Sequence, residues 1–149
     1  EAGLPAVADP GSQLVKLCHR HNIEVVPCSG PSSLMLALMG SGLNGQSFAF
    51  LGYIPAKTDE RRQALKSIEK HSASAHQTKI MIETPYRNDS LFADILNVCQ
   101  GSTELCVAAD ITMPDAYIMT KTVAEWKRYV AGKESIIGKR PCVFLILAH

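Results

Sequence analysis

Two short loops of small residues, glycine and proline are the parts of this sequence best suited to holding a ligand. One spans residues 1–11 and the other residues 29–33. Glycine lets the backbone approach a bound molecule closely, and each loop leads into a predicted helix whose first N–H groups can bind an anion. Each loop also has a plainer interpretation: a turn-rich connection for the first, a capped helix start with proline for the second. The absence of G-x-G-x-x-G and Walker-type loops argues against nucleotide sites of those kinds.

Basic side chains recur along one predicted helix and could contact phosphate groups. Arg62, Lys66 and Lys70 are spaced four residues apart, and Lys57 and Arg61 lie close by. Such a stripe can bind a nucleic acid backbone. A solvated helix face is the commoner explanation, because acidic residues are interspersed.

A second group of substrate candidates follows a predicted strand. Arg87 is the better single candidate for substrate contact, and Tyr86 can either stack on a base or fill part of the core. With Lys57 and Arg61, these residues make up the predicted substrate-binding set.

The composition describes a folded chain of ordinary polarity. Apolar residues make up 46% and charged residues 19% of the sequence, so a packed core is expected. The net charge of +1 means that any RNA contact depends on local patches. The longest apolar runs are far shorter than the roughly 20 residues of a membrane span, so we expect a soluble protein without a membrane partner.

The five cysteines and five histidines form no metal-ligand pattern. There is no C-x-x-C pair and no histidine at zinc-ligand spacing. Most cysteines lie in apolar stretches, which is typical of buried thiols in a reducing cytoplasm. We therefore predict no metal site and a cytoplasmic location.

Helix and strand patterns alternate, which predicts an α/β fold with a mixed sheet flanked by helices. We expect helices over residues 11–22, 34–39, 58–70, 88–99 and from 122 onward. We expect strands over residues 23–26, 48–54, 78–83, 104–110, 116–120 and 142–147. Glycine, serine and asparagine cluster at residues 40–47. We therefore divide the chain into residues 1–44, the tail of one domain, and residues 45–149, a second α/β domain.

Three local signals are the most specific. Thr122 and Glu125 fit a capping box, so a helix should begin between them. The run at residues 142–147 is continuously apolar, as in a central strand. Thr58 is the predicted cap of the helix that ends near residue 70.

The loops and several later segments together resemble the tetrapyrrole methylase superfamily, especially its ribosomal RNA methyltransferase branch. That branch carries an aspartate-alanine-glycine-threonine-proline loop ending in aspartate-proline-glycine, then a proline-glycine-proline-serine turn. It also has glycine-phenylalanine-leucine-proline and glutamate-serine-proline-histidine-arginine segments. The matching residues here are 1–5, 9–11, 30–32, 50–57 and 83–87. The resemblance covers nearly the whole chain.

The resemblance implies two α/β domains, with S-adenosylmethionine held in the cleft between them, usually in a homodimer. It implies donor-binding roles for residues of both predicted domains. These are Ala2, Gly3, Leu4, Pro5, Ala8, Asp9, Ser32, Ser33, Glu83, Thr84, Pro85 and Ala109. The family's first glycine-rich motif is absent, so we expect a fragment that lacks the N-terminal region and can be inactive alone.

Methyl transfer from a sulfonium is an in-line displacement. The protein must align donor and acceptor, and must help remove a proton when the acceptor is a hydroxyl. Asp110 and Glu83 are the carboxylates that we predict as proton acceptors or orienters, although a strand-end carboxylate also accepts backbone hydrogen bonds. Residues 109–115 replace most of the charged groups that the ribosomal branch carries near the acceptor.

Three functional hypotheses follow. The leading one is an S-adenosylmethionine-dependent methyltransferase acting on ribosomal RNA ribose or a related acceptor. The second is a tetrapyrrole (corrin or porphyrin) methyltransferase, which is disfavoured because residues 1–11 and 83–87 look like the ribosomal branch. The third is a non-catalytic binding or dimerisation module.

Overall fold

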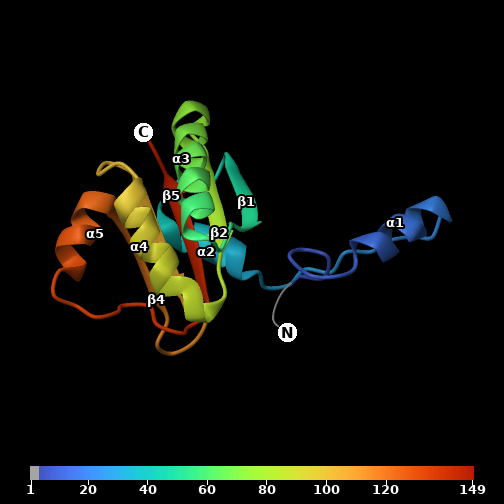
Figure 1. Cartoon of the computed structure of the whole chain (residues 1–149). Helices are drawn as coiled ribbons and strands as arrows, with labels where there is room; N and C mark the ends of the chain where they lie inside the picture. Colours follow the sequence, from blue (N-terminus) through green and yellow to red (C-terminus); the bar gives the residue numbers. More distant parts are fainter. Residues whose placement is uncertain (1–3) are drawn as a thin grey trace.

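The chain folds around one five-stranded sheet of mixed direction (Figure 1). The structure is a computed structural model and describes residues 4–149. The strands are β1 (Phe48–Tyr53), β2 (Thr78–Ile82), β3 (Glu104–Ala109), β4 (Tyr117–Thr122) and β5 (Cys142–Leu147). Their order across the sheet is β1-β2-β5-β3-β4, with β1 and β2 parallel and each other neighbouring pair antiparallel. The predicted mixed α/β fold is confirmed.

Helices cover both faces of the sheet. Those on one face are α3 (Thr58–Ala75), α4 (Asn88–Val98) and α5 (Val123–Val130). α2 (Ser33–Ser41) packs on the other face. A 3₁₀ turn, η1 (Pro85–Arg87), leads from β2 into α4. No helix in the described range combines the length and the apolar character that crossing a membrane requires.

The strands at the centre of the sheet are buried on both faces. All of β5 is buried, as its continuous apolar run predicts. Along β3 the side chains alternate between two cores. Leu105, Val107 and Ala109 face the layer of α3, α4 and α5, whereas Cys106 and Ala108 face α2. Two consecutive residues at the end of β3 therefore point to opposite faces of the sheet.

The segment that carries α1 (Ser12–Arg20) projects away from the sheet (Figure 1). None of the residues of α1 is buried, and Leu14 is 67% exposed. The predicted helix is confirmed, but the predicted strand at residues 23–26 is wrong. Strand backbone requires a hydrogen-bonding neighbour, and no strand within residues 4–149 pairs with this stretch.

The two predicted helix starts have different outcomes. The capping box at α5 is confirmed, because the Glu125 N–H donates to the Thr122 hydroxyl and the Thr122 N–H donates to the Glu125 carboxylate. The predicted Thr58 cap is wrong: Lys57 occupies the N-cap of α3, and no side chain caps it. α3 also runs past its predicted end to Ala75, and His76 closes it with a left-handed φ of 47°.

α2 is in close contact with the sheet that follows it in sequence. A Cβ at Gly40 would lie only 3.1 Å from Cδ1 of Ile118 in β4. The Thr120 hydroxyl donates to the Ser41 carbonyl at 2.7 Å. The helix before residues 40–47 therefore touches the unit after them, and the division into residues 1–44 and 45–149 stays a prediction.

Candidate functional site

Three strands end at the same edge of the sheet. β1, β2 and β3 run in one direction, because β1 is parallel to β2 and both β2 and β3 are antiparallel to β5. Glu83 directly follows β2, and Asp110 directly follows β3. Ligands of open α/β sheets bind outside the carboxyl ends of such strands. The fold therefore brings both predicted carboxylates to the expected edge, although α4 separates them in sequence.

A cavity of about 440 Å³ lies at this edge. Ser33, Glu83, Pro85 and Asp110 line it, and these four predicted donor-binding or catalytic residues come from three separate segments of the sequence. The remaining lining residues are Tyr53, Ile82, Ala108, Ile111, Met113, Pro141, Cys142 and Val143. Cavities of about 300–1,000 Å³ with mostly apolar walls and a few polar groups are typical small-molecule sites.

The sequence patterns missed most of the apolar wall. Ala108 lines the cavity, whereas the fully buried Ala109 side chain, predicted to contact the donor, faces the opposite core. β3 is apolar on both faces, so its sequence gave no sign of which alanine faces which side. Cys142 and Val143 line the cavity because β5 is antiparallel and begins beside the ends of β2 and β3. Only the sheet order places them there.

Glu83 holds the turn at the edge of the cavity. Its Oε1 accepts hydrogen bonds from the Thr84 N–H at 2.7 Å and from Nε of Arg87 at 3.1 Å. Its Oε2 accepts from Nη2 of Arg61 at 3.1 Å. The side chain is 1% exposed and both oxygens have donors. The geometry therefore fits Glu83 as an orienter of residues 84–87.

Arg61 is the centre of a buried ion network. Its side chain is 1% exposed and bridges Glu83 and Asp94, with Nη1 at 3.3 Å from the Asp94 carboxylate. Its Nε donates to the Pro55 carbonyl at 3.0 Å. Arg62 reaches the same aspartate at 3.1 Å from a half-exposed position. Arg61 therefore does not belong to the predicted solvent-facing stripe, and burial keeps it from the substrate contact predicted for it.

Tyr86 and Arg87 stand beside Pro85 in the η1 turn. Tyr86 is 68% exposed, and the Arg87 guanidinium carbon lies 4.9 Å from its ring centroid. Arg87 also donates to the Tyr86 hydroxyl at 3.0 Å. The pair is thus presented to solvent as one unit, in reach of a substrate. Lys57 is exposed as well, at 3.7 Å from Glu60.

Asp110 lies in strained backbone at the cavity. Its φ is 50°, and that of Thr112 is 74°, a value that β-branched residues rarely adopt. Nη1 of Arg140 lies 3.6 Å from its carboxylate, and the side chain is 14% exposed. The Asp110 N–H donates to the Pro141 carbonyl at 3.0 Å. A partly accessible carboxylate is therefore fixed at the cavity beside one cation.

The two N-terminal loops lie against each other. A Cβ at Gly30 would come within 3.2 Å of Cδ2 of Leu4. Ala6 and Ala8 adopt positive φ values of 66° and 55°, which makes the first loop a tight turn. The two loops therefore meet at Leu4 and Gly30, and their shared ligand stays a prediction.

The loops extend beyond the cavity. Pro5, Ala8 and Asp9 are exposed, and of the two loops only Ser33 lines the cavity. Ser32 is the N-cap of α2 and makes no side-chain capping bond. The predicted donor residues Ala2 and Gly3 lie outside the described residues. Their roles, with those of Leu4, Pro5, Ala8, Asp9 and Ser32, stay predictions.

The cysteines divide into buried and accessible thiols. Cys99, Cys106 and Cys142 are buried, whereas Cys28 is exposed. Burial raises the pKa of the Cys142 thiol to about 12, so it lines the cavity in its protonated form. Among residues 4–149, no group of three or more histidine, cysteine, aspartate or glutamate side chains is placed to hold a metal ion.

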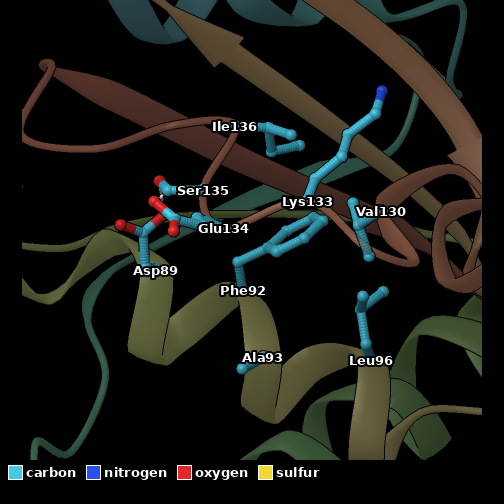
Figure 2. Close-up of a pocket in the computed structure, with 9 residues that line it drawn as sticks. All are labelled: Asp89, Phe92, Ala93, Leu96, Val130, Lys133, Glu134, Ser135 and Ile136. Atoms are coloured by element: carbon cyan, nitrogen blue, oxygen red, sulfur yellow. Dashed lines mark hydrogen bonds between the residues drawn. The ribbon is translucent and has the colours of Figure 1, made fainter.

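A second cavity of about 180 Å³ lies between α4 and the segment that follows α5 (Figure 2). Phe92, Leu96 and Val130 give it an apolar floor. The Asp89 carboxylate at its edge already accepts a hydrogen bond from the Ser135 hydroxyl at 2.8 Å. None of the predicted site residues lines it, so the strand-end cavity is the candidate site.

Sequence comparison finds relatives along most of the chain, although no family model matches it. It is 36% identical over 135 residues to the ribosomal RNA small subunit methyltransferase I of Vibrio cholerae, covering 91% of this chain and 46% of that protein. The protein of the same name from Escherichia coli O157:H7 is 34% identical, with the same coverage. That from Thermotoga maritima is 38% identical over 112 residues, covering 75% of this chain and 48% of that protein. The chain spans about half the length of the curated relatives it matches.

Solved structures share the fold at low sequence identity. The methyltransferase CobJ matches with a TM-score of 0.60 and 14% identity, covering 99% of this chain and 62% of that chain. The cobalt precorrin-4 methyltransferase CbiF matches with a TM-score of 0.59 and 18% identity, covering 97% of this chain and 61% of that chain. Uroporphyrin-III C-methyltransferase from Thermus thermophilus, complexed with S-adenosylhomocysteine, matches with a TM-score of 0.52 and 17% identity. The match covers 97% of this chain and 62% of that chain. At these identities the likeness is one of fold.

Replacing Arg61 with methionine should test the buried network, because Glu83 and Asp94 would lose their shared cation. We expect the free energy of unfolding in urea to fall by about 3–5 kcal/mol, the cost of leaving buried charge uncompensated. Arg62→Met is the matched control. It removes a half-exposed cation from the same aspartate and should cost less than about 1 kcal/mol. Equal losses in the two variants would contradict the structural role given to Arg61.

Proposed function

Because the chain belongs to the tetrapyrrole methylase superfamily, we propose that it works as part of an S-adenosylmethionine-dependent methyltransferase. One observation carries the proposal. Ser33, the pair Glu83 and Pro85, and Asp110 come from three separate segments of the sequence, yet they line one cavity at the carboxyl ends of β2 and β3. A ligand site requires this convergence, and residues chosen for local reasons alone would not share a cavity.

The residues present fit a methyl donor. The cavity of about 440 Å³ can accept a molecule of that size, and Ile82, Ala108 and Val143 offer apolar wall to a flat ring. The Ser33 hydroxyl lies at the start of α2, where free backbone N–H groups favour a carboxylate. When bound, S-adenosylmethionine supplies a methyl group on a cationic sulfur. This chain would supply the walls, the polar contacts and the nearby negative charge.

We assign the two carboxylates different tasks. Glu83 has donors on both oxygens and 1% exposure, so it orients the turn at residues 84–87. Asp110 lines the cavity with a partly exposed side chain, so it is the group placed to accept a proton from an acceptor hydroxyl. Nη1 of Arg140 lies 3.6 Å from the Asp110 carboxylate and holds it in place.

The acceptor that we propose is ribosomal RNA, through a ribose hydroxyl or a related group. The support is the name shared by the curated relatives, together with the exposed Tyr86 and Arg87 unit beside the cavity. Tyr86 would contact a base and Arg87 a phosphate. The solved neighbours act on other acceptors by their names, and below 25% identity they bear on the fold alone.

The setting of this activity is part of the same proposal. We place the protein in the cytoplasm, where reduced thiols such as those of Cys99 and Cys106 persist. We propose that the protein works as a homodimer, as its resemblance to the superfamily implies.

Titration of S-adenosylhomocysteine by calorimetry tests donor binding. We expect this chain to bind the compound and Ser33→Trp to abolish the binding, because the indole would occupy the cavity. Ser74→Trp makes the same change at an exposed position on α3, away from the cavity, and should bind like the parent chain. Absence of heat with the parent chain, or equal binding by both variants, would contradict the proposal.

Asp110→Asn tests proton transfer without disturbing the backbone, since asparagine tolerates the positive φ that aspartate has here. We expect kcat for methyl transfer to ribosomal RNA to fall by at least about 100-fold with donor affinity unchanged. Asp115→Asn removes the same charge at an exposed position that does not line the cavity, and kcat should stay within about twofold. A D110N enzyme with parental kcat would remove Asp110 from the chemistry.

A further inference from the structure

Positive charge gathers in one segment of this nearly neutral chain. Residues 117–141 carry six lysine or arginine residues and two acidic ones, whereas the rest of the chain carries nine basic and twelve acidic residues. The segment comprises β4, α5 and the loop that leads to β5. A local excess of this kind sets the field that a polyanion meets, even when the net charge of the chain is +1.

Two lysines of this segment converge on one exposed aromatic ring. Nζ of Lys121 lies 4.9 Å from the ring centroid of Tyr129, and Nζ of Lys133 lies 3.5 Å from the same centroid. Two ammonium groups beside one ring repel each other, and an anion bound between them would offset that repulsion. We call Lys121, Tyr129 and Lys133 the lysine pair cluster.

Neither lysine of the lysine pair cluster lies within ion-pair distance of an aspartate or glutamate in residues 4–149, although Glu125 is near enough for Lys121 to contribute to lowering its pKa. Figure 2 shows the amino group of Lys133 pointing away from Asp89 and Glu134. Interaction with Lys133 lowers the pKa of the Tyr129 phenol, as expected beside uncompensated positive charge. The cluster therefore has the electrostatics of an anion site.

The cluster is linked to the candidate site by two side chains. Arg140 lies 3.6 Å from Asp110, which lines the strand-end cavity. The guanidinium of Arg140 lies 5.9 Å from the ring centroid of Tyr117, whose buried hydroxyl has no hydrogen-bond partner among the described residues. Tyr117 in turn neighbours Tyr129 and affects its phenol. Arg140, Tyr117 and Tyr129 therefore lie between the cavity and the two lysines.

We propose that the lysine pair cluster binds the phosphate backbone of the RNA whose reacting nucleotide lies at the strand-end cavity. The inference rests on the proposed function and adds a second contact point to it. An RNA chain carries a phosphate at every nucleotide, so it can place one at the cluster while another part occupies the site. A small acceptor held in the cavity would have no group to offer there.

The basic stripe on α3 is the rival surface, and its charge is better compensated. Arg61 is buried, Arg62 is paired with Asp94, and Lys57 is paired with Glu60. Lys66 and Lys70 remain on that helix without such a pairing in the described range. They supply a control pair that removes the same charge from a different helix.

The test measures binding of this chain to a fluorescein-labelled single-stranded RNA of about 15 nucleotides, by anisotropy over a range of salt concentrations. We expect Lys121→Ala/Lys133→Ala to weaken binding about tenfold near physiological salt. The slope of log K against log salt should fall by about 1.4, the value for two lost phosphate contacts on a single strand. Lys66→Ala/Lys70→Ala should change neither quantity appreciably, and Lys121→Arg/Lys133→Arg should retain binding.

Several results would overturn the proposal. They are equal losses in the two alanine pairs, a larger loss in the α3 pair, or no RNA binding by the parent chain. Competition by inorganic phosphate as strong, per phosphate, as competition by unlabelled RNA would also overturn it, since the cluster would then be a free-phosphate site.

Calorimetry with S-adenosylhomocysteine on the same K121A/K133A variant separates the two proposals. Loss of RNA affinity with intact donor binding supports the cluster, whereas absent donor binding in the parent chain counts against the proposed function alone.

Discussion

A single buried cation ties the candidate site to the core of this protein. Arg61 comes from α3, Glu83 follows β2 and Asp94 lies in α4. The Arg61 side chain is 1% exposed, and its guanidinium contacts both carboxylates and so joins the three elements. A buried carboxylate is costly without a nearby cation, so Arg61 couples the stability of these three elements. The other oxygen of Glu83, Oε1, accepts hydrogen bonds from the Thr84 N–H and from Arg87, and so holds the turn beside the cavity.

The direction of the strands supplies the rest of the site. Because β1, β2 and β3 all end at one edge, Glu83 and Asp110 reach one cavity from distant parts of the sequence. The chain leaves β3 through positive φ values at Asp110 and Thr112, a conformation that costs about 1–3 kcal/mol per residue. Strain of this kind is kept where surrounding structure holds it, here by the Asp110 N–H bond to the Pro141 carbonyl.

Local signals in the sequence predicted local structure well. The capping box at α5 depends on two residues three apart, and β5 is apolar throughout because it is buried on both faces. Three donor-binding residues that the resemblance implies, Ser33, Glu83 and Pro85, line the cavity. The Thr58 cap is a local signal that was wrong, since Lys57 occupies the N-cap of α3, whereas the other misplaced residues depend on partners far along the chain. The burial of Arg61 needs two carboxylates from other elements, and the choice between Ala108 and Ala109 needs the sheet to have two covered faces.

The central claim is that a methyl donor binds where the ends of β2 and β3 meet the start of α2. Hydrogen exchange with and without S-adenosylhomocysteine tests it most directly, because it reports protection segment by segment. The account predicts slower exchange at three places together: residues 84–87, residues 110–113 and the start of α2, with no change at the cavity between α4 and the segment after α5. Unchanged exchange at those three places, or protection confined to the second cavity, would contradict it.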